Sequence, residues 1–177
     1  TGPGQEELLA QFVKMGDSED KVMWPAGIQC DGDDNVYIAD EWLNRILIFD
    51  SGGSFIENWG STGQGEGELF RPSGLQLDAD ENLYVVDAGN HRVQKFTKSG
   101  TFLGGWGSKG AGPGEFNSPW GITIDHEDYV YVVDHKNSRV QKFTSEGEFA
   151  MEIGSFGEGV GELNRPSDVA VDPDGDI

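Results

Sequence analysis

Aspartate and asparagine residues alternate with other residues in three short runs, which is how a calcium-binding loop begins. The runs are Asp31-x-Asp33-x-Asn35, Asp78-x-Asp80-x-Asn82 and Asp172-x-Asp174-x-Asp176. Oxygen atoms at this spacing could surround a cation, and Asp31, Asp33 and Asn35 are the candidate calcium ligands. No glutamate follows at the twelfth position, however, and strand-like rather than helical residues flank the runs. We therefore favour hairpin turns, in which Asp and Asn bond to nearby backbone, over a calcium site.

Histidine and cysteine give weaker patterns. His91 and His135 fall in neighbouring modules and could lie close together, whereas His126 belongs to a hairpin at the opposite end. A three-histidine metal centre is therefore not expected. Cys30 has no nearby catalytic partner, and we expect it to pack at the end of an apolar strand. No metal or other cofactor is predicted.

Two glycine-rich loops could suggest phosphate binding, at Gly63-x-Gly65-x-Gly67 and Gly110-x-Gly112-x-Gly114. Neither ends in the Gly-Lys-Ser/Thr of a phosphate-binding loop, and neither leads into a helical pattern. We predict that both loops link one module to the next.

The positions of these residues are set by a repeat of 47 residues. Proline marks each repeat, at Pro25, Pro72, Pro119 and Pro166. The same step relates the pairs Asp40/Arg45, Asp87/Arg92 and Asp134/Arg139, and it relates Trp59 to Trp106. A catalytic site is usually asymmetric, so features present in every repeat are interpreted as scaffold. The Asp–Arg pairs are predicted to be structural clamps, and the two tryptophans are predicted to pack between modules.

Each repeat has four strand-like segments separated by turn residues. In the second repeat the first segment begins with Pro-x-Gly at 72–74 and the second is the apolar run 83–86. The third is the run 92–96, and the fourth ends at Trp106. The second segment is apolar without strict alternation, which fits a strand covered on both faces. Four short strands in every 40 to 50 residues are typical of a β-propeller, whose blades bury their faces only by stacking.

Three motifs stand out in the repeat: Tyr84-Val85-Val86-Asp87 followed by Asn90-His91-Arg92-Val93-Gln94-Lys95-Phe96, the equivalent residues 131–134 and 137–143, and Gly112-Pro113-Gly114-Glu115-Phe116. With these motifs the repeat resembles the NHL family of β-propellers. The resemblance covers practically the whole chain. It implies an all-β fold of four-stranded antiparallel blades, and relatives of this kind usually close six of them.

The 177 residues hold about 3.5 blades in one propeller segment. We assign residues 1–23 to the end of a preceding repeat, with Leu8 and Phe12 at positions equivalent to Phe55 and Trp59. Residues 24–71, 72–118 and 119–165 are full repeats, and 166–177 begin a further one. The count predicts a portion of a longer protein; the alternative is a short chain that closes its ring by self-association.

The charge is strongly acidic, with 32 Asp and Glu against 12 Lys and Arg and a formal net charge of −20. Such a charge repels phosphate backbones and anionic lipid surfaces, so nucleic-acid binding is disfavoured. No run is long and apolar enough for a membrane span. Acidity of this degree favours an extracellular or periplasmic setting.

Four residues that are not matched between repeats, Trp42, His91, His135 and Trp120, are the better guide to function. The first three fall in loops between second and third strands, and Trp120 falls at the entry of the next blade. Arg71 and Arg165, which share one repeat position, are expected to border the same face. These loops share one end of a four-stranded meander, so the six residues are the candidate binding rim. The prediction is a non-enzymatic scaffold for a protein or peptide partner, which is the role that the NHL resemblance also implies.

The alternative is a metal-dependent propeller enzyme, similar to the peptide-amidating lyase or to lactonases, with part of its site in blades outside this sequence. The inner strands are expected to present Gln29, Gln76 and Thr123 towards the axis, with no histidine among them. This pattern favours the scaffold.

Overall fold

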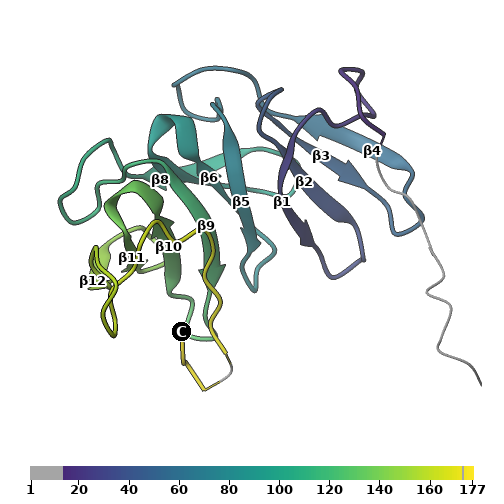
Figure 1. The fold of residues 1–177 in the computed structure, drawn as a ribbon. Coiled ribbons are helices and arrows are strands. Elements are labelled where there is room, and N and C mark those ends of the chain that lie inside the picture. Colours follow the sequence, from purple (N-terminus) through teal and green to yellow (C-terminus); the bar gives the residue numbers. More distant parts are fainter. Residues whose placement is uncertain (1–13, 173) are drawn as a thin grey trace, which may run out of the picture.

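Each full repeat folds into one four-stranded antiparallel sheet in the computed structural model, which describes residues 14–172 and 174–177 (Figure 1). The first blade contains β1 (Pro25–Cys30), β2 (Val36–Asp40), β3 (Arg45–Phe49) and β4 (Phe55–Trp59). The second contains β5 (Pro72–Leu77), β6 (Leu83–Asp87), β7 (Arg92–Phe96) and β8 (Phe102–Trp106). The third contains β9 (Pro119–Ile124), β10 (Val130–Asp134), β11 (Arg139–Phe143) and β12 (Phe149–Ile153). Single 3₁₀ turns, η1 (Ala88–Asn90) and η2 (His135–Asn137), follow β6 and β10. The all-β propeller fold is confirmed.

The core consists of apolar layers between adjacent blades. Every residue of β2, β6 and β10 is buried, because each of these second strands lies in the middle of a sheet with neighbours on both faces. One layer joins Tyr37, Ala39, Ile46 and Ile48 of the first blade to Leu69, Leu75, Leu83, Val85 and Phe96 of the second. A matching layer joins the second and third blades. Stacking therefore buries the faces that a single blade would leave exposed.

The tryptophan pair contributes to these layers as predicted. The ring of Trp59 lies 4.9 Å from that of Phe96 in the next blade, and Trp106 lies 5.6 Å from Phe143. The indole of Trp59 also donates a hydrogen bond to the carbonyl of Lys98 at 3.1 Å. These rings are inter-blade packing residues.

The inner strands β1, β5 and β9 lie close together because each carries a glycine at the same repeat position. A Cβ atom on Gly27 would come within 2.1 Å of the Ser73 carbonyl oxygen, and one on Gly74 within 2.6 Å of that of Trp120. Side chains at these positions would force the blades apart, so glycine sets the spacing at the axis.

The fourth repeat is only partly formed. Residues 166–172 run beside β9 (Figure 1), and Val169 and Val171 pack against the third blade, but no strand is assigned after Ile153 in the described residues. An inner strand needs a second strand for its hydrogen bonds, and no such strand is present beside residues 166–172 in the described part of the chain. The turn is present, since the Asp172 amide donates to the Asp176 carbonyl at 2.9 Å. The predicted strand in residues 1–13 lies outside the described residues.

The prediction that Cys30 packs in the interior is wrong, because this side chain is exposed. Its repeat equivalents Leu77 and Ile124 pack against the preceding blade. Cys30 lies on the face of the first blade where Val22 covers β2 and β3 but no preceding blade is described to cover β1, and Ile28 on the same strand is 66% exposed for the same reason.

Candidate functional site

The Asp–Arg pairs form clamps at the end of the second strand. Asp87 accepts a 2.8 Å hydrogen bond from Arg92 Nε, and Asp134 accepts one of 2.9 Å from Arg139 Nε. Both carboxylates are fully buried and also accept the backbone amides of Phe70 and Asn117 in the incoming links. The structural interpretation is confirmed for these two blades.

The first blade departs from this arrangement. Asp40 still accepts backbone amides, from Met23 and Trp24, but Arg45 instead donates to the carbonyl oxygens of Ser18 and Lys21. The Nε atom of Arg45 is buried with no partner among the described residues. In this blade Asp40 and Arg45 therefore each bind backbone groups, and the clamp consists of hydrogen bonds without an ion pair.

The first acidic run forms the hairpin turn between β1 and β2. One carboxylate oxygen of Asp31 accepts the amides of Asp33 and Asn35 at 3.0 and 2.9 Å, and the other accepts Tyr37 Oη at 3.1 Å. Burial raises the pKa of Asp31, but hydrogen bonds from Asn35, Asp33 and Tyr37 outweigh it and lower the pKa to about 2. The Lys98 ammonium lies 3.4 Å from this carboxylate and 2.6 Å from Glu81. A cation of the protein itself thus compensates these charges.

The glycine loops are links between blades, and their amides are already occupied. Gly65 and Gly112 each donate to the carboxylate of the glutamate three residues later, Glu68 and Glu115, at 2.8 Å. Residues Thr62 and Leu69, and likewise Lys109 and Phe116, form short parallel bridges. These amides donate to a carboxylate of the chain itself, which supports the structural interpretation of these loops.

A cavity of about 800 Å³ opens on the rim between the first two blades, and we call it the aromatic cavity. Trp24 and Trp42 are 61% and 68% exposed, and Phe70 is 42% exposed. Arg71 donates from Nε to Glu41 at 2.8 Å, and Glu41 is buried. The full lining is Trp24, Glu41, Trp42, Asn44, Phe70, Arg71 and Trp120.

A second rim cavity, of about 690 Å³, lies between the second and third blades, and we call it the basic cavity. The Trp120 and His135 rings lie 6.5 Å apart in its wall. Its lining holds five basic or imidazole side chains and no acidic one: Arg71, His91, Lys109, His135 and Lys136. Phe70, Arg71 and Trp120 line both rim cavities, so the two are contiguous.

His91 has a structural partner at this rim. The amide of Ser118 donates to its Nδ1 atom at 3.0 Å. At the equivalent positions of the other blades, Asn44 accepts the amide of Arg71 at 2.7 Å and Ser138 accepts that of Arg165 at 3.2 Å. The residue type of His91 is not matched between repeats, but its hydrogen-bonding role is.

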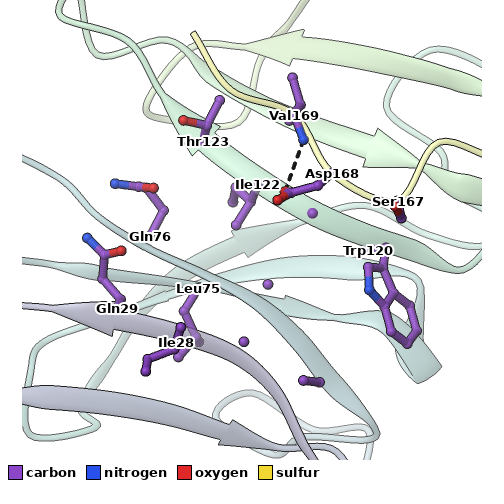
Figure 2. A pocket seen from close by; sticks show the side chains of 14 residues that line it. Ile28, Gln29, Leu75, Gln76, Trp120, Ile122, Thr123, Ser167, Asp168 and Val169 are labelled. Carbon is purple, nitrogen blue, oxygen red and sulfur yellow. Dashed lines mark hydrogen bonds between the residues drawn. The ribbon is translucent and has the colours of Figure 1, made fainter. Parts of the chain in front are cut away.

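The third hollow, of about 500 Å³, is an axial groove along the inner strands. Figure 2 shows Gln29, Gln76 and Thr123 together at one end and Trp120 with Ser167 at the other. The predicted axial residues therefore do line the axis. Asp168 occupies the position held by glycine in the other three repeats, and its carboxylate accepts the amide of Val169 at 3.0 Å. Trp120 lines this groove as well as both rim cavities.

Five of the six predicted rim residues thus gather around two joined cavities: Trp42, Arg71, His91, Trp120 and His135. Arg165 is exposed but lies outside both linings, and His126 is on an exposed hairpin away from them. Sequence reasoning missed Lys109 and Lys136. Lys136 could have been found from the repeat, because it occupies the same repeat position as the predicted rim residue Trp42.

Within residues 14–172 and 174–177, no three His, Cys, Asp or Glu side chains are grouped so that they could hold a metal ion. None of the helices in that part of the chain has the length and apolar character needed to cross a membrane.

Several different proteins of known structure have a fold similar to that of this chain. Virginiamycin B lyase from Staphylococcus aureus is 17% identical with a TM-score of 0.64, covering 86% of this chain and 47% of that one. Hydrazine synthase from Kuenenia stuttgartiensis is 15% identical, with a TM-score of 0.66 over 98% and 44%. A chain of a nidogen/laminin complex is 19% identical, with a TM-score of 0.63 over 84% and 52%. At these identities the likeness shows the fold alone, and this chain spans about half the length of those structures.

No curated protein matches the sequence. One family model does, twice, over residues 27–96 and 82–143, and its family is described as a 6-bladed beta-propeller. The two matches overlap and together span more than half of the chain, from β1 to β11. The chain therefore belongs to this 6-bladed beta-propeller family, DUF5128.

Proposed function

We propose that this chain is a non-enzymatic binding module, of the NHL type suggested by its repeat motifs, whose rim holds a protein or peptide partner. The observation that carries the proposal is the exposure of Trp24, Trp42 and Phe70 around one cavity. Large aromatic side chains left in water at a concave surface are typical of an interaction site.

The repeat strengthens this argument. Position 42 is tryptophan in the first blade, glycine in the second (Gly89) and lysine in the third (Lys136). All three blades form the same four-stranded sheet, so the sheet does not require an indole there. The tryptophan is more easily explained by what it contacts outside the chain.

Peptide selection tests the proposal. A random dodecapeptide library displayed on phage is selected against the protein, and enriched peptides are measured by fluorescence anisotropy. The double variant Trp24→Ala/Trp42→Ala is expected to weaken binding at least tenfold, since aromatic anchors often contribute about 2 kcal/mol or more.

Phe156→Ala is the matched control, because Phe156 is 73% exposed but lines neither rim cavity. It should leave binding unchanged. A failure to enrich any peptide, or equal binding by the double variant, would contradict the proposal.

A further inference from the structure

The lysines of this acidic chain fall into two groups. Lys95, Lys98 and Lys142 each lie near a carboxylate, at 2.9 Å from Asp78, 2.6 Å from Glu81 and 3.4 Å from Asp125 respectively. The other four, Lys14, Lys21, Lys109 and Lys136, have no carboxylate oxygen within 4.0 Å in the described residues. Of these, the exposed Lys109 and Lys136 line one cavity together, and no acidic side chain lines it although the chain has 32 acidic residues.

The surroundings of these lysines keep the cavity positive. No acidic side chain lines it, and Arg71 stands at its border with the aromatic cavity. Burial lowers the pKa of His91, and the charges of Lys109 and Lys136 lower it further, against the opposing charges of Asp134 and Asp87. Ions separated by more than about 8 Å are largely screened at physiological salt, so the local cations outweigh the distant net charge.

Arg71 is held in place at the junction of the two cavities. Its guanidinium bonds to Glu41, yet its side chain remains 59% exposed while that of Glu41 is only 10% exposed. Because Arg71, Phe70 and Trp120 line both cavities, one ligand could contact aromatic and cationic surfaces together.

We propose that the rim binds an acidic peptide segment, with a bulky apolar side chain in the aromatic cavity and neighbouring Asp or Glu carboxylates facing Lys109, Lys136 and Arg71. This inference rests on the proposed function and adds the chemical class of the partner. The positions of Trp42 and Lys136 are equivalent in the repeat, so one scaffold position supplies an apolar contact in the first blade and a charged contact in the third.

A nucleic acid fits these observations less well. Its affinity depends on how many phosphates are neutralised, and this cavity offers few cations within a chain of net charge −20. An extended polyanion would meet the acidic remainder of the surface, whereas a short acidic segment can lie within the positive area.

Four fluorescent probes test the proposal against the protein by anisotropy. Three are dodecapeptide pools with the same aromatic residues, in which the remaining variable positions are Asp/Glu, Asn/Gln or Lys/Arg. The fourth is a single-stranded oligouridine of twelve nucleotides. The acidic pool is expected to bind at least tenfold more tightly than the neutral pool at physiological salt, and high salt should remove this difference.

The double variant Lys109→Gln/Lys136→Gln should lower the affinity for the acidic pool about five- to tenfold and leave the neutral pool unaffected. Lys109→Arg/Lys136→Arg should retain acidic binding. Lys14→Gln/Lys21→Gln removes the same charge from residues that line neither cavity, and it should have no effect. Circular dichroism melts verify that each variant is folded.

The outcomes separate the two proposals. If the neutral or basic pool binds as tightly as the acidic one and Trp24→Ala/Trp42→Ala abolishes it, the acidic preference is wrong while peptide binding stands. Tighter binding of the oligouridine than of the acidic pool would also overturn the inference. If no peptide pool binds at all, the proposed function itself fails.

Discussion

The backbone amide of Ser118 donates a 3.0 Å hydrogen bond to Nδ1 of His91 and so joins the end of one blade's loop to the entry of the next. Accepting this bond requires a neutral Nδ1, so the proton of the imidazole is on Nε2. His91 has a left-handed backbone with φ of 58°, as does Asn44 in the equivalent position with 56°. We call this hydrogen bond, together with the left-handed residue that accepts it, the joint between blades. Asparagine adopts this left-handed conformation readily.

His91→Asn is expected to preserve the joint, because Asn44 makes the same bond in the first blade. His91→Ala should lower the free energy of unfolding by about 1–2 kcal/mol relative to His91→Asn, since it loses the acceptor and fits the left-handed backbone less well. Urea denaturation measures both. Equal stability of the two variants would show that the bond contributes nothing.

The same joint should respond to pH. Burial, Lys109 and Lys136 lower the pKa of His91 below its usual 6.5. The unfolded chain therefore takes up this proton at higher pH than the folded one, and stability is full above pH 6.5 and declines as pH falls below it. The difference in unfolding free energy between wild type and His91→Asn should show this slope. A difference independent of pH between 7 and 5 would contradict it.

Asp31 should account for part of the loss of unfolding free energy at acidic pH. Its folded pKa is about 2, against an ordinary value of 3.8, so its contribution is present above pH 3.8 and is lost as pH falls towards 2. The shift corresponds to about 2 kcal/mol. Asp31→Asn should flatten the dependence of stability on pH between 4 and 2, measured by thermal melts. Asp33→Asn is the control, because that side chain is 78% exposed in the same turn; an identical flattening there would refute the assignment.

The inner-strand glycines should not tolerate a methyl group. In Gly74→Ala, the new Cβ would lie 2.6 Å from the Trp120 carbonyl oxygen and 3.0 Å from Ile122, so the blades must shift. Overpacking of this kind costs about 1–3 kcal/mol. Gly104→Ala is the matched control, because it is also a strand glycine but its Cβ meets nothing within 4 Å. Denaturant midpoints should fall for the first variant and stay or rise for the second.

The Asp–Arg clamps should differ in strength between blades. Arg92→Met leaves the buried carboxylate of Asp87 without its ionic partner and is expected to cost about 3–5 kcal/mol. Arg45→Met should cost less, because Arg45 bonds only to carbonyl oxygens and its Nε has no partner in the described residues. Equilibrium unfolding of both variants, with Asp87→Asn alongside Arg92→Met, checks this order. Equal losses would mean that the ion pair adds nothing to the clamp.

Much of the fold could be predicted because the information is local and repeated. Apolar runs without alternation, such as the one in Val130–Asp134, indicate strands that are covered on both faces, and turn residues mark the ends of these strands. The Cys30 prediction failed because burial of an inner-strand residue depends on the neighbouring blade, which a strand pattern cannot supply. The clamp of the first blade differed because Arg45 had backbone carbonyls within reach as alternative partners.

For the candidate site too, some features could be predicted from the sequence and others depend on how the blades stack. The sequence by itself determined the repeat, the strands, the scaffold role of the Asp–Arg pairs and the set of unmatched residues on one rim. Only the tertiary structure decided that Lys109 and Lys136 meet Arg71 in one cavity free of acidic side chains, and that this cavity joins one lined by Trp24 and Trp42. The reason is geometric, because loops from separate blades converge only when the blades stack. The positive local charge of the rim therefore cannot be predicted from a sequence whose total charge is −20.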